Sequence, residues 1–210
     1  MTDQRTRWNE RYSQSINNPV EDKPAFVLTQ YAHLLPNAGA ALDLACGLGA
    51  NALFLAQTEA ERRLEVVAWD ISDVAIERLR QQVKLSGLAV HAEVRDVVAR
   101  PPEPDQFDVI VVSHFLERLI IPHLTAALKP GGLIYYQTFI RNKAPGVGPD
   151  NPAFLLADNE LLQLFRGLKV LAYREDGVQG NVTRGFRNEA MLVAQNPKSG
   201  ATVDKLNLNT

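Results

Sequence analysis

The stretch from Ala40 to Leu53 constrains the fold of this chain more than any other. It starts as a short apolar run, reaches an acid at Asp43, turns through Gly47 and Gly49, and continues with the spacing of a helix. A strand, a glycine-rich turn and a helix in this order are typical of an open α/β sheet that binds a nucleotide-like ligand at the turn. Glycine suits such a turn because its backbone bends tightly and lets a ligand approach without a Cβ in the way.

The rest of the chain repeats this alternation of strands and helices. We expect strands at residues 40–44, 64–69, 89–94, 107–113, 133–139, 168–173 and 190–194, and helices at 3–13, 24–35, 50–57, 73–86, 119–128 and 158–165. Such alternation indicates a mostly parallel sheet with helices on both faces. No helix is expected between the last two strands. The prediction is therefore a Rossmann-like α/β fold with a seven-stranded, mostly parallel sheet and an antiparallel last strand.

Capping and turn residues set several of these boundaries. Pro24 suits the first position of a helix, and Ser72 suits the cap before the helix that Gly87 ends. The run at residues 129–132, Lys-Pro-Gly-Gly, is expected to stop a helix before the fifth strand. Asp158 is expected to cap the late helix.

Composition limits the class of function. The 210 residues are 46% hydrophobic, which is ordinary for one large globular domain. A net charge of −2 provides no electrostatic basis for non-specific nucleic-acid binding, so we expect a small-molecule partner and no nucleic acid. We find no apolar leader and no apolar run long enough for a membrane span. The single cysteine, Cys46, suits a reducing compartment, so we expect a cytoplasmic protein. We expect it to be a monomer or a homodimer.

Two classes of cofactor use such a turn, and Asp43 helps to separate them. The spacing Gly47-x-Gly49-x-x-Ala52 also fits the dinucleotide pattern, so an NAD-dependent oxidoreductase is an alternative. A carboxylate at the end of the strand repels a pyrophosphate and attracts a ligand that carries an ammonium and a sulfonium group. The pattern Asp43-x-Ala45-x-Gly47-x-Gly49 resembles the first motif of class I S-adenosylmethionine-dependent methyltransferases. Many members have glycine where this chain has Ala45.

This resemblance extends to the ends of the following strands. It implies that Asp70 holds both ribose hydroxyls, since a carboxylate has two acceptor oxygens. It also implies that Asp96 accepts from the adenine amino group while the backbone N–H of Val97 faces the ring. Cys46 is interpreted as a small apolar residue of the turn and not as a nucleophile. The candidate cofactor-binding residues are Trp8, Tyr12, Asp43, Ala45, Cys46, Gly47, Gly49, Asn51, Asp70, Ile71, Asp96, Val97, Ser113 and His114.

Within that class the chain resembles the small tellurite-resistance-type and thiopurine-type methyltransferases. The segments that carry this likeness are Trp-Asn-Glu-Arg-Tyr at 8–12, Cys-Gly-Leu-Gly-Ala-Asn at 46–51 and Gly-Pro-Asp-Asn-Pro at 148–152. Those families place an N-terminal cap over the cofactor and act on small, often soft nucleophiles. The fourth strand lacks the Asn/Asp-Pro-Pro-aromatic signature of enzymes that methylate nucleobase amines.

The resemblance divides the chain into three parts. We expect an N-terminal helical cap at 1–36, an S-adenosylmethionine-binding methyltransferase domain at 37–197 and a flexible tail at 198–210. Trp8 and Tyr12 lie four residues apart and share one face of a helix, so the segment before Pro24 is a candidate lid over the cofactor. A permanently docked helix is the alternative.

Catalytic groups are harder to identify. His114 follows the fourth strand and is a weak candidate for a general base, because a histidine that only packs or hydrogen-bonds beside the pocket is the more common case. A thiolate or other soft anion needs mainly positioning, so no catalytic residue is assigned. The candidate substrate-binding residues are Phe115, Arg118, Arg141, Arg174 and Arg184, and no metal-ligand cluster is found.

The expected function is S-adenosylmethionine-dependent methyl transfer to a small-molecule acceptor, with S-adenosylhomocysteine as the other product. Besides the NAD-dependent oxidoreductase, a cofactor-binding protein without catalysis stays open, because methyltransferases often have no obligatory catalytic side chain.

Overall fold

One seven-stranded sheet runs through the molecule in the computed structural model, which describes residues 4–14, 23–57 and 63–197. Its strands are β1 (Ala38–Leu44), β2 (Arg63–Asp70), β3 (Val90–Val94), β4 (Phe107–Ser113), β5 (Leu128–Phe139), β6 (Lys169–Arg174) and β7 (Glu189–Gln195). Their order is β3-β2-β1-β4-β5-β7-β6, and β7 runs in the direction opposite to the other six strands. The predicted mostly parallel sheet with an antiparallel last strand is confirmed.

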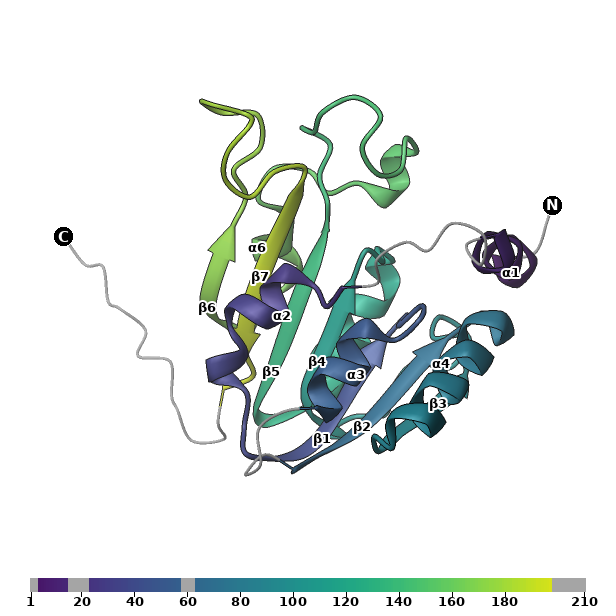
Figure 1. The fold of residues 1–210 in the computed structure, drawn as a ribbon. Coiled ribbons are helices and arrows are strands. Elements are labelled where there is room, and N and C mark those ends of the chain that lie inside the picture. Colours follow the sequence, from purple (N-terminus) through teal and green to yellow (C-terminus); the bar gives the residue numbers. More distant parts are fainter. Residues whose placement is uncertain (1–3, 15–22, 58–62, 198–210) are drawn as a thin grey trace.

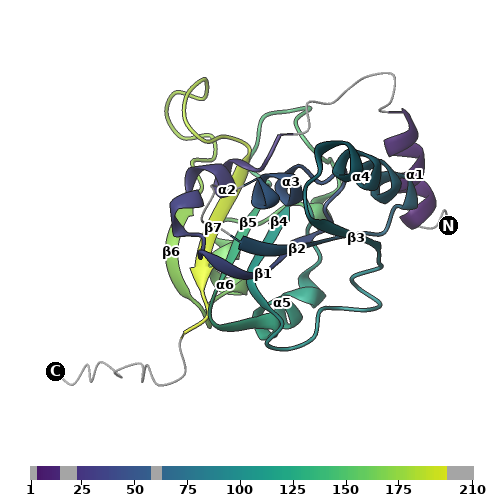
Figure 2. The same cartoon turned by 60° about the horizontal axis from the view of Figure 1, so that its bottom comes forward.

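Helices cover both faces of this sheet (Figures 1 and 2). Figure 2 shows α2, α3 and α4 on one face and α5 and α6 on the other, with α1 beside α4. The helices are α1 (Gln4–Gln14), α2 (Phe26–Gln30), α3 (Ala50–Ala56), α4 (Asp73–Ser86), α5 (Ile121–Ala127) and α6 (Glu160–Leu164). The expected cap of α4 is confirmed, since Ala75 N–H donates to Ser72 Oγ at 3.1 Å.

Successive side chains of the central strands point to opposite faces of the sheet and pack into two separate hydrophobic cores. In β4, Val109 and Val111 pack with Leu28 of α2, whereas Ile110 and Val112 pack with Leu124 of α5. All six are fully buried. A strand buried on both faces reads as a continuous apolar run, which is why the sequence of β4 is almost wholly apolar.

Three predicted boundaries are wrong. The helix expected at 24–35 breaks at Tyr31 into α2 and a 3₁₀ helix, Ala32–Leu34. Helix α5 ends at Ala127, close to its expected end, but the fifth strand starts at Leu128 and not at Leu133, with a register shift between Phe107 and Val109 of β4.

The late helix also begins differently from the prediction. The residue before α6 is Asn159, in the left-handed region at φ 59°, and it replaces the expected cap at Asp158. Asn159 makes no side-chain capping bond there. The short polar side chain of asparagine tolerates this left-handed backbone conformation. Neither the spacing of apolar residues nor the capping pattern in the sequence indicates that Asn159 adopts it.

The parallel strands place their carboxyl ends at one edge of the sheet. The turn after β1, the ends of β2 and β3, and the residues after β4 therefore meet there. Figure 1 shows the loops that follow β5 and β6 rising from this same end of the molecule. In an open α/β sheet this edge is where a ligand binds.

Candidate active site

The turn after β1 has the backbone of a ligand-binding loop. Gly47 and Gly49 adopt φ of 56° and 85°, and Ala45 also has a positive φ of 53°. A Cβ on Gly49 would lie 2.4 Å from a methyl carbon of Leu79, so glycine is needed there for the close packing of the turn on α4. Ala45 holds a left-handed conformation that glycine adopts more easily.

Asp70 lies directly beside this turn. Its carboxylate accepts hydrogen bonds from the backbone N–H of Gly47 at 2.9 Å and of Ser72 at 2.8 Å. The residue is only 6% exposed, and this burial raises its pKa above the ordinary value, while the backbone hydrogen bonds act in the opposite direction. Each carboxylate oxygen retains acceptor capacity beyond these bonds, which suits it to a hydroxyl-bearing ligand.

Asp43, by contrast, turns into the protein. It is fully buried, and it accepts from the backbone N–H of Ala52 at 3.0 Å and from Asn51 Nδ2 at 3.3 Å. The same Asn51 amide donates to Ser113 Oγ at 2.9 Å, and its oxygen accepts from the backbone N–H of Ala25. Asp43 therefore holds the turn and the start of α3 in place.

The ends of β2 and β3 carry the remaining candidate cofactor residues. Asp96 Oδ1 accepts from the backbone N–H groups of Val98 and Ala99, which forms a tight turn and uses one of its two oxygens. Val97 is buried, and Ile71 is half-buried beside the Asp70 turn. The two strand ends are linked, because Arg95 N–H donates to the carbonyl of Asp70 at 2.7 Å.

Helix α1 lies against the start of α4. Asn9 accepts from Ser72 Oγ and donates to Asp73 Oδ1, both at 2.6 Å, and Arg78 donates to the carbonyl of Tyr12 at 3.0 Å. The rings of Trp8 and Tyr12 stack with centroids 5.8 Å apart, so the predicted shared face is confirmed.

The same helix reaches the glycine turn through Tyr12. A Cβ built on Gly47 would lie 2.8 Å from the Tyr12 hydroxyl oxygen, which places this hydroxyl against the turn. Cys46, next in the turn, is buried and matches its interpretation as a small apolar residue.

Most of the candidate substrate-binding residues have partners within the protein. Arg118 forms a double ion pair with Glu160, at 2.6 and 2.9 Å, and donates to the carbonyls of Ala153 and Leu155. This pairing lowers the pKa of Glu160 and raises that of Arg118. The Arg118 guanidinium thus links two loops and has a structural role.

The other candidates divide between the surface and the core. Arg141 and Arg184 are exposed, and Arg174 binds Asp176 through two nitrogens, at 2.9 and 2.7 Å. Phe115 is half-buried and packs against the core on the α5 side. Of the five candidates, the structure brings Arg174 alone to the pocket described next.

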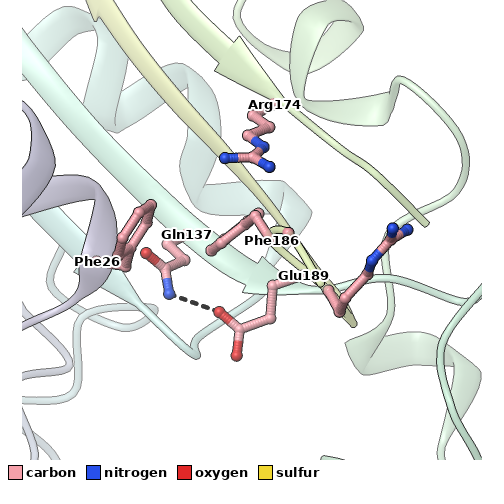
Figure 3. A pocket seen from close by; sticks show the side chains of 7 residues that line it. Phe26, Gln137, Arg174, Phe186 and Glu189 are labelled. Atoms are coloured by element: carbon pink, nitrogen blue, oxygen red, sulfur yellow. Dashed lines mark hydrogen bonds between the residues drawn. The ribbon is translucent and has the colours of Figure 1, made fainter. Parts of the chain in front are cut away.

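A cavity of about 480 Å³ opens beside the ends of β5 and β7 (Figure 3). It is lined by Phe26, Gln137, Arg174, Gly185, Phe186, Arg187 and Glu189. Of these residues the sequence pointed to Arg174 alone. Gln137 could have been identified from the sequence, because it is a polar residue near the end of a mostly apolar strand.

His114 connects this cavity to the rest of the site. Its Nε2 lies 2.9 Å from Glu189 Oε1, and its ring stacks on Phe139 with centroids 4.9 Å apart. Its φ of 54° is unusual for a residue other than glycine and costs of the order of 1 kcal/mol. Among the residues described by the structure, no group of three acidic, histidine or cysteine side chains is arranged to hold a metal ion. In the same part of the chain, no helix has the length and apolar character that crossing a membrane requires.

Comparison with known proteins finds similar sequences for part of this chain. Residues 41–132 match the family described as "Methyltransferase domain". The "Ubiquinone biosynthesis O-methyltransferase" of Azoarcus sp. (strain BH72) is 33% identical over 107 residues, which are 48% of this chain and 44% of that protein. This chain thus spans less than half the length of the curated relatives that it matches.

Solved structures extend the likeness to the whole fold. TehB from Haemophilus influenzae has a TM-score of 0.64 and 23% identity over 90% of this chain and 66% of its own. A structure titled "Conversion of a Disulfide Bond into a Thioacetal Group during Echinomycin Biosynthesis" has a TM-score of 0.69 and 24% identity over 96% of both chains. The segment from β1 to the glycine run of β5 is thus similar to the methyltransferase domain family, and the chain as a whole shares its fold with TehB.

Proposed function

We propose that this protein transfers a methyl group from S-adenosylmethionine to a small-molecule acceptor and releases S-adenosylhomocysteine. The observation that carries the proposal is the Asp70 carboxylate, buried and held 2.9 Å from the backbone N–H of Gly47 in the glycine turn. An acid in this position suits the paired hydroxyls of a ribose. S-adenosylmethionine, when bound, supplies a methyl group activated by a positively charged sulfonium.

The residues around the turn fit this ligand in three ways. Asp70 would hold the ribose, and Asp96 with the backbone of Val97 would hold the adenine. The glycine turn would take the remainder of the ligand, where a Cβ on Gly47 would already fill the space against Tyr12. Asp43 contributes a buried negative charge behind the turn, and it acts by holding Asn51 and Ala52.

The family match and the antiparallel β7 support this function over an NAD-dependent oxidoreductase. The names of the relatives support a small acceptor, since one is an O-methyltransferase of ubiquinone biosynthesis. The net charge of −2 supports the same class over nucleic acid. The single cysteine supports a reducing, cytoplasmic location. We place the acceptor beyond β4 and β5, at the cavity beside Glu189, and treat the chain as a monomer or homodimer.

Calorimetry on the Asp70→Ala variant tests the cofactor assignment. Loss of two charge-assisted hydrogen bonds, at roughly 1.5–3 kcal/mol each, should weaken binding of S-adenosylhomocysteine at least tenfold. Asp158→Ala removes an exposed carboxylate and serves as the matched control. Unchanged affinity in a folded Asp70→Ala protein would remove Asp70 from the ribose site.

A labelled-methyl assay on cell extract tests the acceptor class and catalysis together. Label from S-adenosylmethionine should enter the low-mass fraction in the presence of the protein. Label in RNA or DNA would contradict the small-molecule proposal. Tight cofactor binding with no label in any fraction would instead support a non-catalytic binding protein.

A further inference from the structure

A chain of three hydrogen bonds joins α2, β5 and β7 to the residue after β4. The backbone N–H of Val27 donates to Gln137 Oε1 at 2.8 Å, Gln137 Nε2 donates to Glu189 Oε2 at 2.6 Å, and His114 Nε2 lies 2.9 Å from Glu189 Oε1. We propose that His114 is a catalytic base, positioned by Glu189 and Gln137, and that the cavity beside it takes an uncharged aromatic acceptor with an ionisable O–H or S–H group. This inference rests on the methyl-transfer function proposed above.

The hydrogen-bond pattern determines which nitrogen of His114 is basic. Because Val27 N–H donates, the oxygen of the Gln137 amide must face it, and the amide nitrogen must therefore face Glu189. Glu189 then accepts on both oxygens, so His114 Nε2 carries the hydrogen. In neutral imidazole the other nitrogen, Nδ1, then holds the lone pair. No hydrogen bond of the described residues engages Nδ1.

The position of His114 suits a base that acts between the proposed cofactor site and the proposed acceptor site. Its backbone N–H donates to the Gln137 carbonyl at 2.9 Å, and its ring stacks on Phe139, which fixes the orientation of the side chain. The side chain remains 48% exposed, so the ring edge is accessible. The preceding residue, Ser113, accepts from Asn51, which follows the glycine turn in the first turn of α3. His114 therefore adjoins both the proposed cofactor turn and the cavity.

The charges around the cavity argue against an anionic acceptor. Arg174 is paired with Asp176 through two hydrogen bonds. Arg187 donates to the backbone carbonyls of Asp176, Gly177, Gln179, Asn181 and Arg184. Both cationic side chains among the described lining residues, Arg174 and Arg187, are thus hydrogen-bonded within the protein. Glu189 adds a carboxylate to the same lining. An anionic acceptor would therefore find no cationic side chain among these described residues that is not already hydrogen-bonded, whereas an uncharged acceptor needs none.

The apolar wall of the cavity favours an aromatic acceptor. Phe26 and Phe186 stack with centroids 5.4 Å apart and an angle of 24° between their planes. Figure 3 shows Phe26 and Phe186 near the hydrogen-bonded side chains of Gln137 and Glu189. Phe26 keeps 42% of its surface exposed, so a flat ring has an aromatic surface to pack against.

The proposed step is a proton transfer. The acceptor's O–H or S–H bond breaks, its electron pair stays on the oxygen or sulfur, and the proton moves to Nδ1 of His114. The resulting imidazolium donates through Nε2 to Glu189, whose negative charge stabilises it. The proton then leaves to solvent when the product departs. A base acting in this way typically contributes about 100-fold or more to the rate.

Binding of 4-nitrophenol tests the inference without turnover, because its phenolate absorbs visible light and the neutral phenol does not. The full-length protein, saturated with S-adenosylhomocysteine, is titrated at a pH where free 4-nitrophenol is mostly neutral. We expect bound phenolate in the wild type, loss of the visible band in His114→Gln, and at least a tenfold reduction in Glu189→Gln. His123→Gln, an exposed histidine on α5, serves as the control and should retain the band.

The outcomes separate this inference from the function on which it rests. Absence of bound 4-nitrophenol, or binding as the neutral phenol in the wild type, would overturn the role of His114. An unchanged band in His114→Gln would do the same. If the wild type binds S-adenosylhomocysteine but fails the 4-nitrophenol test, the proposed methyltransferase function is unaffected. If the wild type does not bind S-adenosylhomocysteine, the proposed function itself is wrong. Far-ultraviolet circular dichroism confirms that each variant is folded.

Discussion

Helices α1 and α2 both precede the first strand, yet the molecule holds them by different means. In α2, Val27 and Leu28 are fully buried, and Asn51 and Gln137 accept from the backbone N–H groups of Ala25 and Val27. Helix α1 buries no residue completely and is attached through polar contacts to α4. The predicted N-terminal cap therefore contains two segments with different physical attachments.

The difference teaches which of the two is able to move. A fully buried leucine contributes roughly 1.5–3 kcal/mol, whereas an ordinary hydrogen bond contributes about 1 kcal/mol net. Helix α2 is thus fixed to the sheet beside the cavity. Helix α1 rests on the glycine turn and the start of α4, and its role as a lid over the cofactor remains our prediction. Residues 15–22, which belong to the predicted lid, lie outside the described residues.

The largest contrast should come from truncating one apolar side chain in each helix. We expect Leu28→Ala to lower the free energy of unfolding by about 2–5 kcal/mol, because the cavity left in the core relaxes only partly. Trp8→Ala should change it by less than about 1 kcal/mol, since α1 has no completely buried residue. Urea unfolding measures both. Equal losses would mean that α1 is as firmly part of the core as α2.

A single methyl group in the glycine turn should disturb α1 specifically. Gly47→Ala places a Cβ 2.8 Å from the Tyr12 hydroxyl at a residue with φ of 56°. Gly87→Ala has a comparable φ of 70° and nothing within 4 Å of the new Cβ. Both should lose about 1–2 kcal/mol from backbone strain. Hydrogen exchange in α1 should rise in Gly47→Ala alone, and equal rates in the two variants would show that the contact is unimportant.

Removing the N-terminal segment tests the lid directly. Deleting residues 1–22 should weaken S-adenosylhomocysteine binding several-fold while leaving the melting temperature of the ligand-free protein almost unchanged. The reason is that α1 contributes little buried surface but lies against the turn. In the full-length protein, hydrogen-exchange protection of residues 8–13 should increase with ligand. Full protection without ligand would refute the lid and support a permanently docked helix.

The smallest effect concerns the acid at the start of α4. The hydrogen bond from Asn9 lowers the pKa of Asp73, so an ionised Asp73 favours docked α1. This contribution is present above the ordinary pKa of a free aspartate and is lost as the pH falls through the lowered value. Asn9→Ala should return the pKa of Asp73 towards the ordinary range. Carbon-13 titration of the Asp73 carboxyl measures this shift, and an unchanged pKa would show that the contact does not persist in solution.

The sequence by itself determined the order and type of the elements and the location of the glycine turn. Strand β4 matches its predicted bounds, and α4 lies between its predicted cap Ser72 and terminator Gly87. These features depend on hydrophobic periodicity and on backbone preferences of neighbouring residues, which are local properties. Residues 41–132, which include most of the motifs that carried the family resemblance, match the family described as "Methyltransferase domain".

Only the tertiary structure decided which polar groups are free to act. In the sequence, Asp43 and Arg118 were both candidates for ligand binding. In the structure, Asp43 is buried and hydrogen-bonded to Asn51, and Arg118 is paired with Glu160. His114 and Glu189 are 75 residues apart and meet because antiparallel pairing brings β7 beside β5. No local pattern encodes such a contact. The cavity and its proposed base therefore follow from the packing of distant strand ends, whereas the glycine turn was recognisable from adjacent residues.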